Sequence, residues 1–570
     1  MLKDLNLKAA AAPAVILLAA LLAFGFTFKM GFIWDDHRLI EENPRLAISA
    51  SNLAAAFKGD PFSQGLNYYR PLLTVSHIAD FAIWGYRPLG YRLVNFIFFS
   101  GTAVLFLYLA LALGFSSAAA FWAAVLLAVH PAVTEQLLVI AGRAELASSA
   151  CMLASLLLFL KNMSALSFVF FLAAAGFKEN GIITPALAAL CLWYLERGKK
   201  DYLKLLPFFA FIPVYFFLRH QALGMDALSK GLGPVMAGLF LKVPQSVLAY
   251  LKEAALPFDM HSHRMQPDLA ILRWLSLPAL AAAAFLLIRK GGRTALFCAG
   301  WYLLNLAPKL PILASNDLML DHWVYLSNAG IFLWAAWRLE SAGTWRRFAL
   351  PAAAAVLVCA SAFNTTCRDT DLKNYEHAAR SSVSKPMLYN LAREYYLLGR
   401  TPESRALLER LCAAEPGNVM YLNGLALARW KSGDTPGALA ALEPALAAQP
   451  GAAETLFNKY CVLVAADRGR EAEACLDAAL KTDPDYAPAL LALARGRASA
   501  GWSAEAAAFY ARILKASPYN LEALNDYGIL LARSGDHSGA EELFRKALKV
   551  SPGLESARKN LTRLEKLTNK

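Results

Sequence analysis

Two adjacent carboxylates, Asp35 and Asp36, lie in a charged and non-repetitive stretch, Phe32–Pro44, that directly follows an apolar run. Either acid could act as a general base, because a carboxylate within hydrogen-bond reach of an acceptor hydroxyl can take its proton. The alternative is a loop carboxylate that caps the next helix. A charged segment at the first exit from a membrane is a place where an enzyme could present a base to a membrane-bound substrate.

Other charged residues interrupt apolar runs, where a charge is costly unless it faces a cavity or a partner. Arg143 follows His130 and Glu135, and its fork of donors could hold a phosphate. An Arg143 that is paired with Glu145 or Glu135 is the alternative. Lys178 is a second candidate phosphate partner, or else part of an ordinary turn with a salt bridge.

Two further clusters precede later apolar runs. His261, His263 and Arg264 form a basic patch, and Asp321 and His322 stand just before the run that begins at Trp323. For the histidines we favour anion or substrate contact over metal, and unassigned loop residues over both. No Walker loop, GxSxG or HExxH motif is present. No cofactor is expected beyond a bound donor substrate, and a divalent metal has no support in the sequence.

The elements that position these residues are predicted to be membrane helices. Of the 570 residues, 57% are hydrophobic and 17% are charged, whereas soluble domains have roughly 45–50% apolar and about 25% charged residues. The chain is therefore expected to be a membrane protein with a soluble part attached. In such a protein the net charge of +13 is better explained by chain orientation and anionic lipid than by nucleic acid.

Apolar runs and basic clusters together predict the topology. The run up to Phe28 is long enough to span a bilayer, and the basic start places the N-terminus in the cytoplasm. Residues 29–88 are then an outer loop. If Pro234–Phe258 does not cross, the positive-inside rule gives about eleven spans. After the first, the other spans are expected near Leu89–Gly114, Ala118–Thr134, Leu146–Leu160, Leu166–Phe177, Ile182–Leu195, Leu205–Arg219, Leu269–Ile288, Ala295–Leu313, Trp323–Trp337 and Phe348–Phe363.

The C-terminal part has an internal repeat. Pro416, Pro450, Pro484, Pro518 and Pro552 recur at intervals of 34 residues, and glycines keep the same register except where Asp467 takes their place. This period is the signature of tetratricopeptide repeats. Five repeats are expected from Lys385 to Pro552, followed by a capping helix. The predicted class is all-α: a polytopic membrane domain (residues 1–370) and then a repeat solenoid (residues 371–570) outside the cytoplasm.

The first helices of the repeats carry asparagines that could bond the backbone of an extended peptide on the concave surface of a solenoid. Solvent-facing polar residues are the alternative. These residues are Asn390, Asn423, Asn458 and Asn525.

In this order, the motifs of the chain resemble those of the transmembrane and tetratricopeptide-repeat-containing proteins, which belong to the membrane-embedded GT-C glycosyltransferases. The resemblance covers nearly the whole chain. The matching segments are Ile33-Trp34-Asp35-Asp36 with Asn43-Pro44, Tyr69-Arg70-Pro71-Leu72, Gly90-Tyr91-Arg92-Leu93-Val94-Asn95, Val129-His130-Pro131 through Thr134-Glu135, Gly142-Arg143-Ala144-Glu145-Leu146, Phe177-Lys178-Glu179-Asn180-Gly181 and Val324-Tyr325-Leu326-Ser327.

The resemblance implies an inverting transferase that moves a sugar, typically mannose, from a polyprenyl-phosphate donor to a Ser or Thr hydroxyl of an exported protein. An acid of the first outer loop would be the base, which corresponds to Asp35 or Asp36 with a slight preference for Asp36. Arg143 and Lys178 would hold the lipid phosphate. The candidate substrate-binding residues are His37, Arg70, His130, Glu135, Arg143, Glu145, Lys178, His263, Arg264, Asp321 and His322.

Two departures concern acceptor choice. The family usually has an acid and an arginine where this chain has Asp321-His322, and its repeat arrays are longer. The expected partners are membrane lipid, the lipid-linked sugar and an acceptor protein, without nucleic acid. The expected location is a bacterial inner membrane with periplasmic repeats, or an endoplasmic reticulum membrane with lumenal repeats in a eukaryote. The competing hypothesis is a catalytically inactive membrane-anchored scaffold. A transporter would show ionisable residues at the midplane and an internal membrane repeat, and neither is clear.

Overall fold

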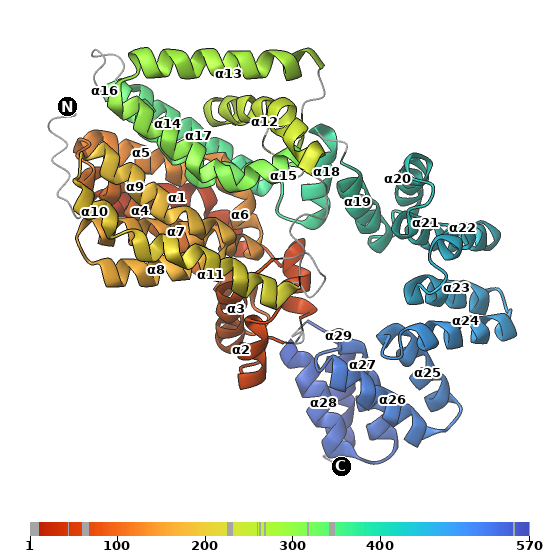
Figure 1. Ribbon diagram of the computed structural model, residues 1–570. Coiled ribbons are helices and arrows are strands. Elements are labelled where there is room, and N and C mark those ends of the chain that lie inside the picture. Colours follow the sequence, from red (N-terminus) through yellow and green to blue (C-terminus); the bar gives the residue numbers. More distant parts are fainter. Residues whose placement is uncertain are drawn as a thin grey trace. The chain divides into compact units, whose positions relative to one another are not determined.

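The computed structural model describes residues 11–43, 45–59, 68–224, 232–258, 260, 264–266, 270–315, 318–340, 348–381, 384–550 and 553–568 (Figure 1). Within these ranges the only strands are β1 (Arg264–Met265) and β2 (Leu318–Met319), which pair antiparallel. All other regular structure is helical, so the all-α prediction is confirmed.

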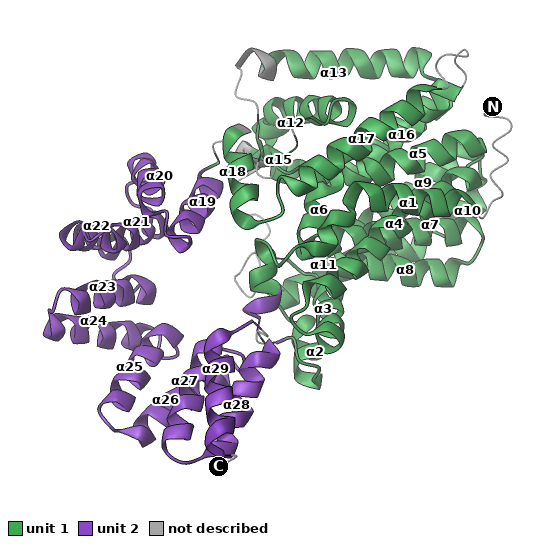
Figure 2. Cartoon of the chain, turned by 180° about the vertical axis from the view of Figure 1, so that it is seen from behind, with its two compact units in different colours: residues 1–39, 46–384 green, residues 40–45, 385–570 purple. Residues whose placement is uncertain are grey.

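The chain divides into two compact units (Figure 2). The first unit consists of Met1–Leu39 and Leu46–Ser384, and the second of Ile40–Arg45 and Lys385–Lys570. The predicted domain boundary between residues 370 and 371 stays a prediction. The helix that follows this boundary, α18 (Asp371–Ser381), groups with the first unit.

Each predicted apolar segment of the first unit contains a helix. The longer helices are α1 (Ala11–Phe24), α2 (Ala50–Ala56), α3 (Pro71–Trp84), α4 (Pro88–Ala112), α5 (Ser117–Val129), α6 (Thr134–Leu138), α7 (Arg143–Leu160), α8 (Ser164–Phe177), α9 (Thr184–Tyr194), α10 (Lys199–Leu203), α11 (Leu206–Leu223), α12 (Leu232–Ala255), α13 (Ala270–Lys290), α14 (Gly292–Leu306), α15 (Leu310–Ser315), α16 (Tyr325–Glu340), α17 (Ala349–Thr366) and α18. Single helical turns are η1 (Gly25–Lys29), η2 (His37–Glu41), η3 (Pro131–Val133), η4 (Ile140–Gly142), η5 (Glu179–Ile183), η6 (Ala307–Lys309) and η7 (Asp321–Val324).

Six stretches among the described residues are long and apolar enough to cross a membrane: Ala11–Lys29, Pro88–Ala112, Ile140–Leu160, Lys199–Leu223, Gly292–Ser315 and Ala349–Thr366. The pair Ser117–Val129 and Pro131–Leu138, bent by 47°, would be a seventh. Several of the other expected spans are helices shorter than the about 20 residues that a span needs. The chain is a membrane protein, and the count of about eleven spans and their orientation remain predictions.

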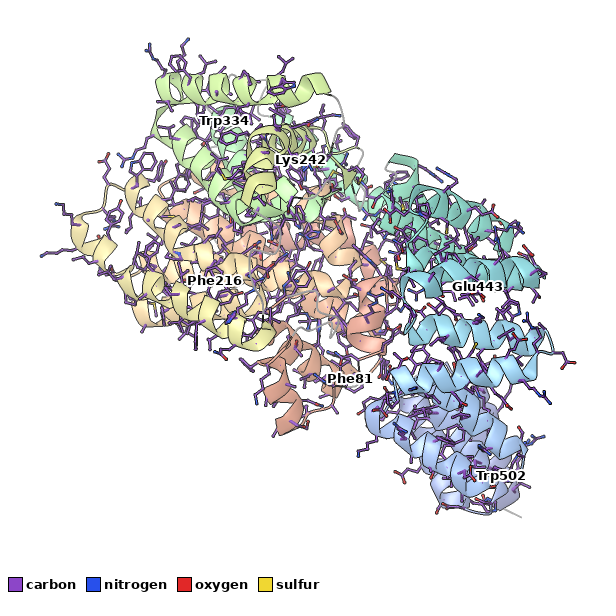
Figure 3. All side chains as sticks on the ribbon, turned by 45° about the vertical axis from the view of Figure 1, so that its right-hand side comes forward. Phe81, Phe216, Lys242, Trp334, Glu443 and Trp502 are labelled. Atoms are coloured by element: carbon purple, nitrogen blue, oxygen red, sulfur yellow. The ribbon has the colours of Figure 1, made fainter. Side chains whose placement is uncertain are left out.

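The surface of the first unit agrees with a lipid environment. Leu22 of α1 is 58% exposed, Ile97 of α4 is 66% exposed and Phe217 of α11 is 60% exposed. Phe216 and Trp334 are likewise exposed, and Figure 3 labels both. Large apolar side chains are thus exposed on several helices, and large exposed apolar patches mark protein or membrane interaction sites. Because lipid offers no hydrogen bonds, helices that satisfy their own backbone groups are the spanning structures available to this chain.

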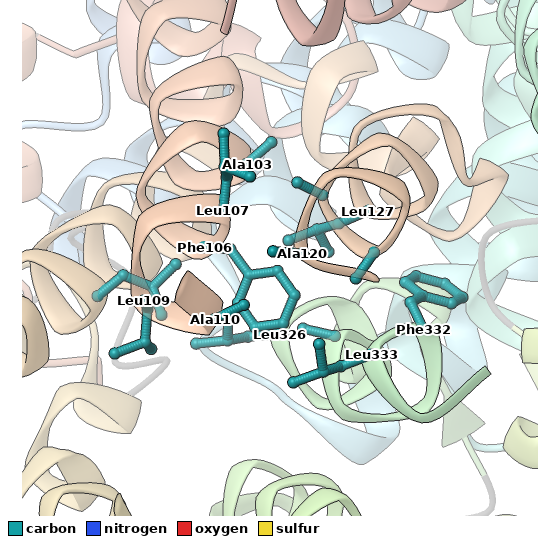
Figure 4. Packing of buried hydrophobic residues seen from close by; sticks show 14 of the residues in the cluster. Ala103, Phe106, Leu107, Leu109, Ala110, Ala120, Leu127, Leu326, Phe332 and Leu333 are labelled. Atoms are coloured by element: carbon teal, nitrogen blue, oxygen red, sulfur yellow. The ribbon is translucent and has the colours of Figure 1, made fainter. Parts of the chain in front are cut away.

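The core of the first unit is built where α4, α5, α14 and α16 pack on one another. Phe106 of α4 points toward Leu326 and Leu333 of α16 (Figure 4). Small residues permit the close approach of helices. A Cβ atom at Gly330 of α16 would stand 2.5 Å from the carbonyl oxygen of Cys298 on α14. This close packing fixes the helix ends that carry the polar residues described below.

The second unit contains the five predicted repeats and the capping helix. The helix pairs are α19 (Lys385–Leu397) and α20 (Thr401–Ala414), α21 (Val419–Lys431) and α22 (Thr435–Ala448), α23 (Ala453–Ala465) and α24 (Gly469–Thr482), α25 (Ala487–Ser499) and α26 (Ser503–Ala516), and α27 (Leu521–Arg533) and α28 (His537–Val550), followed by α29 (Glu555–Thr568). The repeated glycines adopt a left-handed backbone, for example Gly433 with φ 83°, and Asp467 adopts φ 57° in the slot without glycine.

Candidate active site

A cavity of about 230 Å³ lies within the first unit. It is smaller than most ligand pockets, whose volumes are about 300–1,000 Å³. Its wall combines apolar and aromatic side chains, among them Trp34, Tyr68 and Trp323, with many charged ones. The charged lining residues are Asp35, Arg70, Glu135, Glu145, Lys178, Glu179, Lys309 and His322.

These residues come from separate segments at helix ends. Asp35 belongs to the helical turn that leads into η2, Glu135 to α6, and Lys178 to the turn between α8 and α9. Lys309 ends η6 and His322 lies in η7. Residues of the loops that we predicted to share the outer face therefore surround one cavity. The side of the membrane on which it opens remains a prediction.

Asp35 and Asp36 have different surroundings. Asp36 is fully buried, and its carboxylate accepts hydrogen bonds from the backbone N–H groups of Ile33 (3.1 Å) and Ala141 (3.1 Å). The guanidinium of Arg92 is 4.0 Å away. Asp35 is half-buried and lines the cavity, and its carboxylate makes no hydrogen bond to any other described residue. The geometry therefore reverses our slight preference for Asp36, because only Asp35 faces the cavity.

Burial raises the pKa of Asp35 from 3.8 to about 6. The positive charges of Arg38 and Arg70 oppose this rise, and the negative charge of Glu135 adds to it. A general base works best when its pKa lies near the operating pH. Asp35 is therefore ionised at neutral pH and still basic enough to accept a proton.

Two cations of the cavity wall are already paired with carboxylates. Arg70 donates two hydrogen bonds to Glu179, from Nε (3.0 Å) and from a terminal nitrogen (2.8 Å). Lys178 lies 2.5 Å from an oxygen of Glu145. Burial alone would raise the pKa of Glu179, but Arg70 outweighs it and holds that pKa below its usual value. The alternative of a turn with a salt bridge is thus confirmed for Lys178; because Lys178 also lines the cavity, its role as a phosphate partner stays a prediction.

Lys309 is one of two charged residues of the cavity lining that the sequence analysis did not predict as site residues. Its side chain is 2% exposed and lines the cavity, and within the described parts of the chain it has neither an ion pair nor a hydrogen bond. The available signal was a lysine inside the predicted span Ala295–Leu313, because such a charge requires a cavity or a partner. Glu179 was also missed as a site residue, although its motif was recognised.

Arg143 does not line the cavity, contrary to the expectation that it holds a phosphate. It is fully buried, 2.5 Å from Asp80, and its Nε donates to Asn95 (2.8 Å). A terminal nitrogen donates to the carbonyl of Tyr91 (3.0 Å). The prediction of an ion pair was right in kind but named the wrong partner, because α3 supplies Asp80 from a distant part of the sequence.

Two other candidate residues also lie away from the cavity lining. His130 accepts a hydrogen bond from the backbone N–H of Ala132 (3.1 Å) and lies 3.3 Å from the carbonyl of Ala254. It thereby caps η3, where α5 breaks. His37 lies 2.9 Å from Asp371 of α18. Backbone groups meet both ring nitrogens of His130, and Asp371 meets Nε2 of His37, which favours structural positions; a substrate-binding role stays a prediction for both.

Among the candidate residues Arg264, Asp321 and His322, only His322 lines the cavity, and the other two belong to a buried ion-pair network. His322 lines the cavity and lies 3.1 Å from Glu135. Asp321 and Arg264 do not line it; Arg264 lies 3.4 Å from Asp321 and 2.8 Å from Glu253 of α12. Asp321 faces away from the lining because this network ties η7 to β1 and α12. His263 lies outside the described residues.

The asparagines of the repeats mostly bond to neighbouring helices. Asn423 donates to Thr455 (2.8 Å) and accepts from Asn458 (3.2 Å), and both asparagines are buried. Asn525 accepts from Asn560 (2.9 Å). First helices of adjacent repeats lie side by side, so an amide at this position meets the next helix. Asn390 is half-buried, and a peptide-binding role stays a prediction for it.

No group of three or more His, Cys, Asp or Glu residues in the described ranges is arranged to hold a metal ion. The side chains around the cavity instead offer one carboxylate, Asp35, and one lysine, Lys309, that have no ion pair among the described residues, together with three pairs, Lys178–Glu145, Arg70–Glu179 and His322–Glu135. This set can accept a proton and neutralise an anion.

Comparisons with known proteins agree with the repeats and with the motifs. Two family models, both described as tetratricopeptide repeat, match residues 389–454 and 429–496. The chain is similar to protein O-mannosyl-transferase Tmtc1 of Drosophila melanogaster, at 32% identity over 187 residues, which are 31% of this chain and 22% of that protein. It is also similar to protein O-mannosyl-transferase TMTC3 of Mus musculus, at 30% identity over 184 residues, which are 30% of this chain and 20% of that protein.

The matched part is thus about a fifth of the length of these curated relatives. Among solved structures, a thermophilic tetratricopeptide-repeat protein of Thermus thermophilus matches 32% of this chain and 98% of its own at 23% identity, with a TM-score of 0.28. The resemblance seen in the sequence motifs is confirmed: this membrane protein carries tetratricopeptide repeats and is related in sequence to the TMTC protein O-mannosyl-transferases.

Proposed function

We propose that this chain is a glycosyltransferase that moves a mannosyl group from a polyprenyl phosphate to a Ser or Thr hydroxyl of a protein acceptor. The observation that carries the proposal is a base and a cation on one cavity: Asp35 and Lys309 both line it, and neither side chain has a partner among the described residues. The names of the relatives, protein O-mannosyl-transferases, support the reaction class.

In the proposed step, the acceptor oxygen forms a bond to the anomeric carbon of the sugar, and the bond from that carbon to the phosphate oxygen breaks. Asp35 takes the hydroxyl proton, so the carboxylate becomes a carboxylic acid. The electron pair of the broken bond stays on the polyprenyl phosphate. Because the attacking oxygen and the leaving phosphate stand on opposite sides of the anomeric carbon, the reaction inverts the configuration.

The leaving phosphate needs charge neutralisation rather than covalent help. Lys309 would supply it directly, because it lines the cavity and makes no ion pair within the described residues. Lys178 and Arg70 are paired with Glu145 and Glu179, so we assign to these two pairs the orientation of the sugar and phosphate oxygens. Positioning of this kind contributes a large part of catalysis in transfer reactions.

The repeats are proposed to bind the acceptor protein or a partner. A solenoid offers an extended concave surface to a peptide. Sugar identity, lipid and acceptor are all part of this proposal.

The test is mannose transfer by the full-length chain in nanodiscs, with polyprenyl-phosphate mannose as donor and a Ser/Thr-rich peptide as acceptor. Asp35→Asn should reduce transfer by about 10²–10⁴-fold, the usual contribution of a general base. Glu42→Gln is the matched control, because Glu42 is an exposed carboxylate of the same loop. Full activity of Asp35→Asn would rule out this base, and a wild-type chain without any transfer would favour the inactive scaffold.

A further inference from the structure

Residues 33–37, which carry the proposed base Asp35, are called the base loop below. Asp371, an acid more than 330 residues away in the sequence, holds this loop in place. The backbone N–H of Trp34 donates to Oδ1 of Asp371 (2.8 Å), and Nε2 of His37 lies 2.9 Å from Oδ2 of the same residue. Both carboxylate oxygens of Asp371 are therefore directed at the residues that flank Asp35 and Asp36. The side chain of Asp371 is 14% exposed, so the contact is largely shielded from water.

The conformation at Trp34 requires such support. Trp34 has φ 55°, in the left-handed backbone region that residues other than glycine rarely adopt. Its own side chain and that of Asp35 both line the cavity. A backbone in this unfavourable region persists only where surrounding contacts determine it, and the bond to Asp371 is one of these contacts.

The same turn is held from its other side. Asp36 accepts from the backbone N–H groups of Ile33 and Ala141, both at 3.1 Å. The backbone between Ile33 and His37 is thus fixed at both ends, and the carboxylate of Asp35 is left to face the cavity. The two acids with bonded carboxylates, Asp36 and Asp371, hold the one acid without a partner among the described residues.

Helix α18 provides a firm support for Asp371. Arg368, which is 2% exposed, donates from Nε to Asn374 (2.9 Å), and Tyr375 and Ala378 are buried. The backbone N–H of Lys373 is capped by Thr370 (3.3 Å). Because Thr370 supplies the cap, Asp371 keeps both oxygens for the base loop.

We propose that Asp371 is a positioning residue of the transfer reaction, which holds Trp34 and His37 so that Asp35 faces the acceptor hydroxyl. The two contacts of Asp371, with Trp34 and with His37, are called the clamp below. The proposal rests on the proposed function only for its effect on catalysis, because the clamp is present in the structure whatever reaction the protein performs. Asp371 touches neither the cavity nor the reacting atoms. Its helix lies at the end of the first unit, three residues before the first repeat helix α19.

The test compares four variants of the full-length chain in nanodiscs. Asp371→Ala removes both contacts, and His37→Ala removes one of them. Asp371→Asn is the rescue variant, because an amide can still accept from Trp34 N–H and donate to the ring of His37. Asp369→Ala is the matched control, because Asp369 is 38% exposed and pairs with Lys373 one turn away.

The first readout is hydrogen–deuterium exchange of the segment 33–39 without substrate. Asp371→Ala should speed exchange of this segment by about 25-fold, because two hydrogen bonds are lost and each implies a factor of about five. His37→Ala should have a smaller effect because the bond to Trp34 remains, and Asp369→Ala should have none. Unchanged exchange in Asp371→Ala would overturn the clamp, whether or not the protein is a transferase.

The second readout is transfer from polyprenyl-phosphate mannose to a Ser/Thr-rich peptide. Asp371→Ala should lower kcat by about 10–100-fold, the usual cost of a small misplacement, with donor KM within about threefold. Asp371→Asn should restore kcat to within about fivefold. Faster exchange with unchanged kcat would overturn the positioning role while the clamp stands. If Asp35→Asn is also fully active, the assignment of the base fails; if the wild type shows no transfer, the proposed function fails; in both cases the exchange result still decides the clamp.

Discussion

Replacement of Lys309 by methionine is the sharpest test of how the cavity handles phosphate. The side chain keeps nearly the same length and apolar stem, and only the charge is lost. Lys309 is 2% exposed and lines the cavity between two pairs, Lys178 with Glu145 (2.5 Å) and Arg70 with Glu179 (2.8 Å). Because Arg70 and Lys178 are each paired with a carboxylate, Lys309 is the lining cation without an ion pair among the described residues, and we expect it to meet the phosphate.

The magnitude follows from this arrangement. At about 4 Å and an effective dielectric constant of about 20, a lysine and a phosphate charge attract by about 4 kcal/mol. Only the part that grows as the sugar–phosphate bond breaks lowers the barrier. Loss of one group that stabilises the charge developing in a transition state raises the activation free energy by about 2.7–4 kcal/mol in measured cases. We therefore expect Lys309→Met to lower kcat by about 10²–10³-fold.

Initial rates of mannose transfer in nanodiscs, at varied concentration of polyprenyl-phosphate mannose, measure this effect. Lys161→Met is the matched control, because Lys161 is an exposed lysine at the end of α7 and lies outside the cavity lining. Lys309→Arg keeps the charge and should retain most of the rate. A Lys309→Met variant within about threefold of wild type would refute the assignment, because it would place the phosphate beyond the reach of this charge.

Three further predictions concern pH and stability. Because the pKa of Asp35 is raised to about 6, the ionised fraction and with it kcat/KM should rise about tenfold from pH 5 to pH 7, and a pH-independent profile would contradict this base. Asp36→Asn leaves the buried Arg92 without its charge partner, a loss of about 3–5 kcal/mol in comparable cases, so its thermal midpoint should fall while that of Asp35→Asn should not. Asp467→Gly relieves the left-handed backbone at φ 57° and should stabilise the repeats by up to about 1 kcal/mol, measured as a higher urea midpoint of the repeat transition.

The repeat unit was predictable almost completely from the sequence. A period of 34 residues carries its own geometry, because each repeat packs only on its neighbours. Even the slot in which Asp467 replaces glycine adopts the backbone that the register requires. The role of the asparagines was less predictable. Whether Asn423 meets a peptide or the neighbouring Asn458 depends on the distance between adjacent first helices, and that distance is a property of the packed array.

In the membrane unit, the sequence identified the segments that carry charge but not the direction of each side chain. Asp35 and Asp36 are adjacent, and a rotation between neighbouring residues decides which of them reaches the cavity. Arg143 was a candidate phosphate partner by residue type, yet packing of α3 and of α7 on α4 gives it Asp80 as a partner.

The sequence by itself determined the helical class, the repeats, the apolar segments and the set of loops rich in charge, because these follow from local composition and period. Tertiary structure alone decided which charges are cancelled. Lys309 and Asp35 are left without partners among the described residues, while Arg70, Lys178 and Arg143 are paired through residues far along the chain. A charge becomes available for chemistry only when packing leaves it unpaired at a cavity, and that condition depends on distances between helices rather than on residue type.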